Sequence, residues 1–307
     1  MRASDITVAV YADLEKQGYQ GKIISIKHVE ELHRAIEGQY QQGLFDETFC
    51  AAELTGFDFK FSDGFAGAKS LIIVAAPQPQ VSVIFNWEGQ SLRCIIPPIY
   101  SYATDKQIKE LLEAHLKPEG YHLTKAALPL KLAAVRSGLA QYGRNNITYV
   151  AGMGSFHRLA AFISDFPCRE DHWTEPEALD HCRECQACLR ACPTGAIAPD
   201  RFLLHGERCL TFHNERPGAF PAWIHPGWHN CLVGCLFCQK ACPVDKDLLK
   251  MVEARAAFAE VETASLLSVT AGEKIPPETR AKLAQLDIIE YLDLLGRNLK
   301  VLIEKRT

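Results

Sequence analysis

Two runs of cysteines dominate the chemistry that this sequence can perform. Each run ends in a Cys-Pro step, and Cys209 lies between the two. The runs read Cys182-x2-Cys185-x2-Cys188-x3-Cys192-Pro193 and Cys231-x3-Cys235-x2-Cys238-x3-Cys242-Pro243. Three closely spaced thiolates let a short loop fold around one iron-sulfur cube, while the cysteine before the proline can reach a second cube. The pattern therefore predicts a segment that binds two 4Fe-4S clusters.

Structural zinc and disulfides are the alternatives to iron-sulfur clusters. Zinc takes four ligands, usually from two separated pairs, whereas nine of the twelve cysteines lie within residues 182–242. Disulfide frameworks are typical of small secreted domains. The N-terminal sequence MRASDITVAVYADLEKQGY lacks the basic start and apolar core of a secretory signal. We therefore expect a cytoplasmic protein with reduced thiols.

The last cysteine of each run is expected to join the cube of the other run. The predicted ligands of cluster one are Cys182, Cys185, Cys188 and Cys242. Those of cluster two are Cys192, Cys235, Cys238 and one further thiolate, for which Cys209 and Cys231 compete. Three residues separate Cys231 from Cys235, where the first run has two at the equivalent place, and this favours Cys209. The isolated Cys50, Cys94 and Cys168 are expected to be small buried side chains.

The rest of the chain is large enough for a substantial core. It has 307 residues, of which 48% are hydrophobic and 23% charged, as in globular proteins. The formal charge of -4 gives no general attraction to nucleic acid. The most apolar stretch, residues 70–76, is too short to span a bilayer, so no membrane segment is expected.

The elements that would position the cysteines indicate an α+β fold. Apolar residues at helical spacing predict helices over residues 27–42 and 105–116. The continuous run Ser70–Ala76 predicts a buried strand, and residues 81–87 and 90–96 flank Glu88-Gly89 as in a hairpin.

The middle and end of the chain continue this pattern. A helix is predicted over residues 129–140, followed by glycine-containing turns at 141–146 and 152–155 and by strands at 147–150 and 159–163. Beyond Pro243, helical spacing predicts helices over residues 247–258, 263–269, 276–286 and 289–304.

From Ser70 to Pro243 the sequence resembles the epoxyqueuosine reductases and, more distantly, the corrinoid reductive dehalogenases. Residues 133–146 look like that family's A-x-x-A-G-L-G-x-x-G-K-N-T signature, and Gly154-Ser155-Phe156 looks like its Gly-Ser-Trp/Phe turn. The stretch CRECQACLRACPTGAI, residues 182–197, is close to the family pattern residue by residue. Arg208-Cys209-Leu210 is similar to the Arg-Cys-Ile step that ligates the second cluster there, which also supports Cys209.

The resemblance implies three parts. Residues 1–165 would form a nitroreductase-like α+β domain that binds cobalamin, residues 166–248 a double 4Fe-4S ferredoxin-like domain, and residues 249–307 a short helical C-terminal segment. An external donor of ferredoxin or flavodoxin type would supply electrons, which pass through the clusters to the corrinoid and on to an unidentified substrate. The residues expected to contact cobalamin are Gly138, Gly143, Arg144, Asn145, Asn146, Gly154 and Ser155. Simple turn chemistry is the alternative explanation for them.

The sequence also departs from the family pattern. The family has an acidic proton donor three positions before a proline, where this chain has Ala126 before Pro129. The family's Asp-Tyr-His segment after a Tyr-Ala pair is replaced here by Thr104-Asp105-Lys106-Gln107. The tRNA-gripping helical repeats are replaced by a short helical segment without a basic stripe. We therefore expect a small-molecule or corrinoid-protein substrate and not tRNA.

No replacement acid can be assigned from the sequence. The possible donors, each more typical of a cap, a core aromatic or a structural histidine, are Tyr100, Tyr102, Asp105, His157 and His213. The catalytic residue thus stays unknown, although an oxidoreductase is expected. The alternatives are an electron carrier or reductive activator for a partner protein, and a non-catalytic corrinoid-binding protein.

Overall fold

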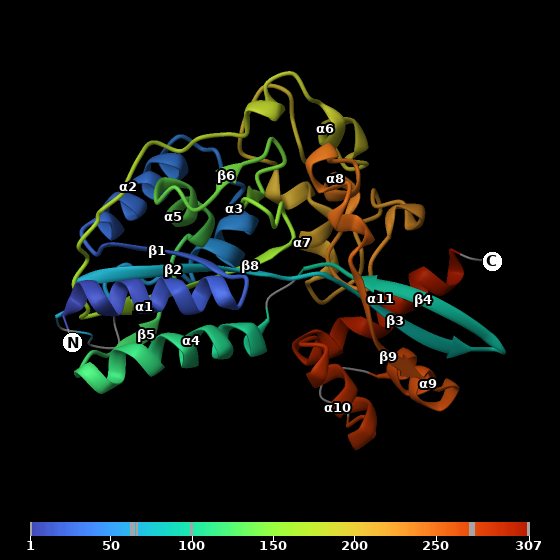
Figure 1. The fold of residues 1–307 in the computed structure, drawn as a ribbon. Coiled ribbons are helices and arrows are strands. Elements are labelled where there is room, and N and C mark those ends of the chain that lie inside the picture. The colour runs from blue at the N-terminus through green and yellow to red at the C-terminus, as the bar shows by residue number, and fades with distance from the viewer. Residues whose placement is uncertain (1, 62–64, 66, 99–100, 270–273, 306–307) are drawn as a thin grey trace. The chain divides into compact units, whose positions relative to one another are not determined.

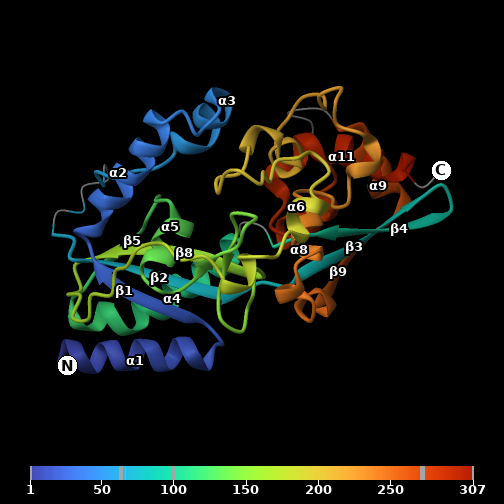
Figure 2. The same ribbon diagram turned by 90° about the horizontal axis from the view of Figure 1, so that it is seen from above.

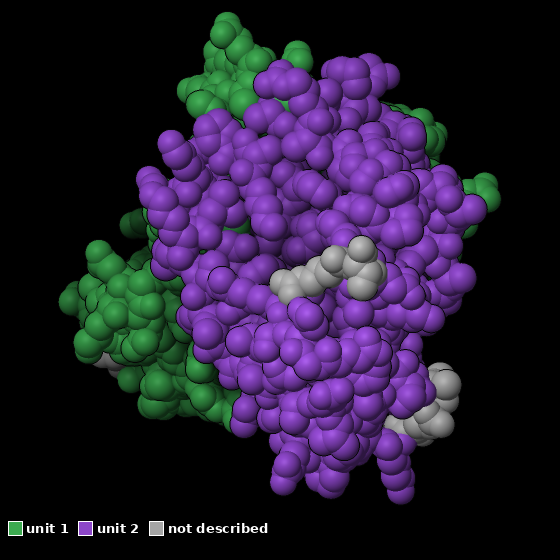
Figure 3. Space-filling view, turned by 90° about the vertical axis from the view of Figure 1, so that its right-hand side faces the viewer, with its two compact units in different colours: residues 1–78, 101–186 green, residues 79–100, 187–307 purple. Residues whose placement is uncertain are grey.

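The computed structural model describes residues 2–61, 65, 67–98, 101–269 and 274–305 (Figure 1). The chain forms two compact units, which Figure 3 distinguishes by colour. Unit 1 comprises residues 1–78 and 101–186, and unit 2 comprises residues 79–100 and 187–307. The predicted domain limits after residues 165 and 248 fall inside these units.

Unit 1 is built on a four-stranded antiparallel sheet in the order β1-β2-β8-β5. Its strands are β1 (Gln20–Ser25), β2 (Ser70–Pro77), β5 (Leu123–Lys125) and β8 (His157–Ser164). The predicted strand Ser70–Ala76 is confirmed as β2, which pairs with β1 on one side and β8 on the other.

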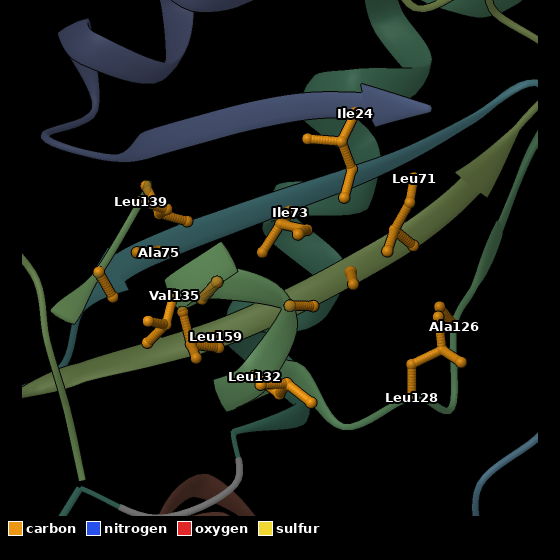
Figure 4. Packing of buried hydrophobic residues seen from close by; sticks show 14 of the residues in the cluster. Ile24, Leu71, Ile73, Ala75, Ala126, Leu128, Leu132, Val135, Leu139 and Leu159 are labelled. Atoms are coloured by element: carbon orange, nitrogen blue, oxygen red, sulfur yellow. The ribbon is translucent and has the colours of Figure 1, made fainter. Parts of the chain in front are cut away.

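The apolar run of β2 is continuous because both faces of the sheet are covered. Leu71, Ile73 and Ala75 pack into one core (Figure 4), and the alternate residues Ile72, Val74 and Ala76 pack into the other. A strand buried on both faces needs apolar side chains at every position. The sequence run therefore reflects a layer of helices on each side.

Four helices cover the sheet of unit 1. Helices α1 (Ala3–Lys16) and α4 (Tyr102–Leu116) lie on one face, and α2 (His28–Gln41) and α5 (Leu130–Arg136) lie on the other (Figure 1). The predicted helix at 105–116 is confirmed but begins earlier, because Ser101 Oγ accepts a hydrogen bond from Thr104 N at 3.2 Å. A short α3 (Glu47–Phe49) continues as a π-helical turn over Cys50–Leu54.

Unit 2 contains a three-stranded sheet in the order β4-β3-β9, whose strands run side by side in Figures 1 and 2. The predicted hairpin is confirmed, with β3 (Gln80–Trp87) antiparallel to β4 (Gln90–Ile96). The helix predicted over residues 247–258 is wrong, because β9 (Val252–Phe258) is a strand that pairs in parallel with β3. Phe258 stacks on Phe85 at 4.7 Å between ring centroids, so tertiary pairing overrides the helical preference of the alanines.

Three longer helices follow β9 in the described part of unit 2. They are α9 (Glu260–Ser268), α10 (Pro277–Gln285) and α11 (Leu292–Glu304), close to the predicted positions. Helix α11 buries Leu294, Leu295 and Leu299 along one side, against the core that contains Phe85 and Phe258. Across the described ranges, no helix combines the length and the apolar character needed to span a membrane.

Candidate metal centre

The predicted ligands of cluster two lie at the ends of short helices in unit 2. Cys192 follows α6 (Ala187–Ala191), Cys209 precedes α7 (Leu210–Asn214), and Cys238 lies within α8 (Phe237–Lys240) shortly after Cys235. The backbone turns before and after such short helices are sharp, so several thiols can face one point. Helices α6 and α8 contact each other.

The four thiols predicted for cluster two are gathered together. Burial raises the pKa of the Cys238 thiol well above its usual range, and the sulfurs of Cys235, Cys209, Cys188 and Cys192 raise that pKa further. Burial also raises the pKa of Cys235 to about 11, with Cys209 and Cys192 among its neighbours. At neutral pH the Cys235 and Cys238 thiols stay protonated until a metal displaces the protons.

A zinc ion and a 4Fe-4S cube both take four thiolates, but the two groups differ in size. Within the ranges that the structure describes, no three His, Cys, Asp or Glu side chains are close enough to hold a single metal ion. Zn–S bonds of about 2.3 Å would bring four sulfurs to roughly 3.8 Å from one another. A 4Fe-4S cube binds one thiolate at each iron, so its four thiolates lie farther apart than those around a zinc ion.

Cys231 has different neighbours. It is 1% exposed, and the sulfurs that raise its pKa, after the dominant effect of burial, are those of Cys235 and Cys94. The next residue, Leu232, donates its N–H to Ile95 O at 2.9 Å and so ties this position to strand β4. Cys231 Sγ donates to Asn230 Oδ1 at 3.2 Å. The Cys231 thiol therefore already has a hydrogen-bond partner within the protein.

The first cysteine run is shaped by Arg144. Its guanidinium donates to the carbonyl oxygens of Cys185 and Cys182 at 3.1 Å each, and to that of Arg183 at 3.4 Å. Cys182 and Cys185 belong to the last residues of unit 1, whereas Cys188 and Cys242 belong to unit 2. The assignment of these four to cluster one continues to rest on their spacing in the sequence.

The residues predicted to contact cobalamin lie around a small hairpin of unit 1, made of β6 (Gln141–Tyr142) and β7 (Thr148–Tyr149). Asn145 Nδ2 donates to Tyr149 Oη at 3.0 Å, and Asn145 Oδ1 accepts from Ile147 N at 3.2 Å. Lys131 Nζ donates to the Asn146 carbonyl oxygen at 3.1 Å. The side chains of Arg144 and Asn145 and the backbone of Asn146 thus already bind protein atoms.

Two of the predicted glycines are required by the protein's own packing. A Cβ on Gly143 would lie 2.4 Å from the ring of Tyr149, and one on Gly138 would lie 2.8 Å from His172 Nε2. Gly138 also has a positive φ of 72°, which glycine adopts most readily. Gly154 accepts from Val150 N, and the adjacent Ser155 is buried. The ring of Tyr149 accounts for glycine at 143, and the positive φ accounts for glycine at 138.

The Gly143→Ala variant should therefore be destabilised by about 1–3 kcal/mol, the usual cost of overpacking. Thermal or urea unfolding of the variant and the parent measures this. Gly38→Ala, in α2 with nothing within 4 Å of the added Cβ, is the matched control and should be neutral or slightly stabilising. A Gly143→Ala protein as stable as the parent but unable to bind a corrinoid would assign the glycine to the cofactor instead.

The possible proton donors have structural partners. Arg158 donates to both carboxylate oxygens of Asp105 at 2.8 Å, and Lys125 Nζ lies 2.6 Å from Asp105 Oδ2. His213 Nε2 donates to Glu207 O at 2.8 Å. Tyr102 is 57% exposed, with Lys125 over its ring. Tyr100 lies outside the described residues.

His157 is held as a neutral ring. Its Nδ1 donates to Gly154 O at 3.0 Å, which leaves Nε2 to accept from Thr148 Oγ1 at 3.0 Å. Burial lowers the pKa of His157 to about 4. Near neutral pH the ring therefore lacks the acidic second proton of an imidazolium, and its one N–H is bonded to Gly154 O.

An acid that sequence reasoning missed lies near the position of the missing donor. Ala126 is buried and donates its N–H to Ala161 O at 2.8 Å, whereas Asp58 N donates to Ala127 O at 2.8 Å. Asp58 thus reaches the neighbouring residue from a separate loop. No spacing rule links two residues so far apart in the chain, so only the fold reveals this proximity.

A surface pocket of about 440 Å³ lies beside the cysteines of unit 2. Its lining residues are Pro193, Thr194, Glu207, Arg208, Trp223 and Trp228. Thr194 Oγ1 lies 3.5 Å from Cys192 Sγ, and Arg208 directly precedes Cys209. Thr194, which lines the pocket, therefore contacts Cys192, a predicted ligand of cluster two.

Comparison with known proteins supports the predicted cluster segment. Residues 181–245 match the family model of a 4Fe-4S double cluster binding domain, so the predicted cluster segment is confirmed. The chain is 29% identical to the epoxyqueuosine reductase of Cyclobacterium marinum over 56% of this chain and 59% of that protein. It is 32% identical to that of Pseudomonas aeruginosa over 45% of this chain and 38% of the relative. The alignments thus span less than two thirds of these relatives.

Solved structures give the same picture of the fold. The epoxyqueuosine reductase of Streptococcus thermophilus matches with a TM-score of 0.68 at 16% identity, over 98% of this chain and 82% of that one. An epoxyqueuosine reductase solved with a tRNA stem loop matches with a TM-score of 0.67 at 19% identity, over 98% and 82%. The predicted α+β fold and the resemblance to epoxyqueuosine reductases are therefore confirmed.

Proposed function

Since the chain shares its fold with epoxyqueuosine reductases, we propose that it is an iron-sulfur reductase that passes single electrons through two clusters to cobalamin. The observation that supports this most strongly is the gathering of Cys192, Cys209, Cys235 and Cys238 inside the double-cluster segment. Each 4Fe-4S cluster, when bound, supplies one-electron transfer at a potential that hydrogen bonds and burial adjust.

The chain's own part in this chemistry is to hold and shield the cubes. Cluster two is assigned to the four gathered thiols, which belong to half-buried residues and would exchange their protons for iron on assembly. Cluster one is assigned to Cys182, Cys185, Cys188 and Cys242. Arg144 binds the carbonyl oxygens of Cys182 and Cys185, so protein hydrogen bonds help to hold the first loop.

The corrinoid is supported by family likeness more than by the described side chains. Cobalamin, when bound, would supply a strongly reducing cobalt centre. Arg144, Asn145 and Asn146 already have protein partners, so they would contact a corrin only by exchanging some of these bonds. These predicted contacts do not form a prepared set of donors, and no reaction step is assigned to them.

A corrinoid titration tests this proposal. Oxygen-free protein with reconstituted clusters should bind added cobalamin at micromolar protein and give the spectrum of the form without a lower base ligand. Cobinamide, which lacks the nucleotide tail, serves as the comparison ligand. Clusters without corrinoid binding at micromolar protein would instead favour an electron carrier or reductive activator for a partner protein.

Electrons would come from an external donor of ferredoxin or flavodoxin type. The pocket lined by Trp223 and Trp228 lies beside Cys192 and Cys209, so we expect the donor to approach cluster two at this surface. The donor would pass its electrons to cluster two one at a time, because each cube accepts a single electron.

The substrate is proposed to differ from that of the epoxyqueuosine reductases. Ala126 at the position of the acidic donor supports this, as do the internal partners of Asp105 and His157. A small molecule or a corrinoid protein is the substrate class that we favour over tRNA. With cobalamin bound and dithionite as the electron source, a tRNA stem loop with epoxyqueuosine should stay unconverted, and its conversion would overturn this part of the proposal.

A further inference from the structure

Asn230 links the second cysteine run to its own backbone. Its Nδ2 lies 3.3 Å from Cys235 Sγ and 3.2 Å from Trp228 O. Its Oδ1 accepts from Leu236 N at 3.0 Å and from Cys231 Sγ at 3.2 Å. The Asn230 side-chain amide therefore contacts the predicted cluster ligand Cys235 and the non-ligand Cys231. It also contacts the backbone at two positions, one before and one after Asn230 in the chain.

The orientation of this amide is fixed by its partners. The Leu236 N–H can only donate, and the Trp228 carbonyl can only accept. Turning the amide over would place Nδ2 against the Leu236 donor and Oδ1 against the Trp228 acceptor, and both hydrogen bonds would be lost. An N–H of Asn230 therefore faces Cys235 Sγ.

Cys231 has a clear role in this arrangement. It is 1% exposed and Leu236 is 0% exposed, so water does not compete for the Asn230 oxygen from their side. The S–H of Cys231 and the N–H of Leu236 share that oxygen and hold the amide plane. This contact gives the extra cysteine of the second run a use other than iron binding.

We propose that Asn230 is a positioning residue that sets the reduction potential of cluster two through its hydrogen bond to Cys235, and that Cys231 is the donor that fixes its amide. Cluster two, when bound by its four thiolates, would accept one electron from the external donor and so gain one negative charge. A hydrogen bond to a ligand sulfur stabilises this additional negative charge and raises the potential. The inference rests on the proposed function, because it needs an assembled cluster two.

A redox titration followed by electron paramagnetic resonance tests the role of Asn230. In Asn230→Leu the equilibrium constant for reduction of one cluster should fall about tenfold, which is about 59 mV for one electron. The other cluster should keep its potential. Asn86→Leu is the matched control, because it removes an amide that donates to Phe258 O at 3.0 Å, in the same unit but on strand β3. Its two potentials should equal those of the parent.

The variants at Cys231 give a second measurement that does not depend on Asn230→Leu folding. Cys231→Ala should lower the same potential, whereas Cys231→Ser keeps a donor and should restore the parent value. Unchanged potentials in both Asn230→Leu and Cys231→Ala would overturn the proposal, as would loss of iron in Cys231→Ser. Failure of the proposed function is separate, because a parent protein without iron and sulfide would show it before any variant is made.

Discussion

The Cys192→Ser variant is expected to lose about half of the iron and acid-labile sulfide of the parent protein, because it removes one ligand of one cube and leaves the other cube intact. Cys209→Ser should behave in the same way, since Cys209 and Cys192 lie together near Cys235 and Cys238. Iron and sulfide analysis of anaerobically purified protein measures both losses.

Cys231→Ser is the matched control for this experiment. It exchanges the same atoms at a buried cysteine of the same segment, but its thiol is bonded to Asn230 Oδ1. Its iron content should stay close to that of the parent. Equal losses in Cys192→Ser and Cys231→Ser would show that the ligand assignment of cluster two is wrong.

Asp105→Ala is expected to lower the free energy of unfolding of unit 1 by about 3–5 kcal/mol, because it leaves a buried arginine without its counter-ion. Asp105 is 5% exposed and Arg158 is 9% exposed, and two hydrogen bonds of 2.8 Å join them. Urea unfolding followed by circular dichroism measures the loss.

Lys106→Ala provides the control on the same helix. Its ammonium lies 3.7 Å from Glu110, and both side chains are exposed, so its removal should change stability little. An Asp105→Ala protein with parental stability but without reductase activity would contradict the structural role. It would instead make Asp105 the missing proton donor.

The sequence was most informative where apolar patterning is strong. The run Ser70–Ala76 and the hairpin around Glu88-Gly89 were predictable because burial dictates every residue of β2 and a two-residue turn joins β3 to β4. Helix α5 ends at Arg136, earlier than predicted, because Gly138 turns into the left-handed region and its N–H bonds to Val135 O.

Strand β9 could not be predicted in the same way. Its residues Val252–Phe258 include three alanines, which favour helices, and its strand conformation depends on pairing with β3 from a distant part of the chain. Helix α1 and strand β1 were also missed, because Ile6, Val10 and Leu14 become recognisable as a buried face only once the sheet is known.

In the candidate site, too, some features were predictable from the sequence and others depend on tertiary contacts. Thiol spacing predicted the cluster segment because iron-sulfur ligands come from one short stretch of chain. The contacts of Arg144 with Cys182 and Cys185 are hydrogen bonds across loops, and such bonds follow no sequence period. The two predicted glycines at 138 and 143 likewise have packing reasons, which only neighbouring side chains reveal.

The most direct test is metal and sulfide analysis of the parent protein purified without oxygen. Two 4Fe-4S clusters require about eight iron atoms and eight acid-labile sulfides per chain, with a paramagnetic signal after reduction by dithionite. One tightly bound zinc ion with no acid-labile sulfide would contradict the proposed redox function.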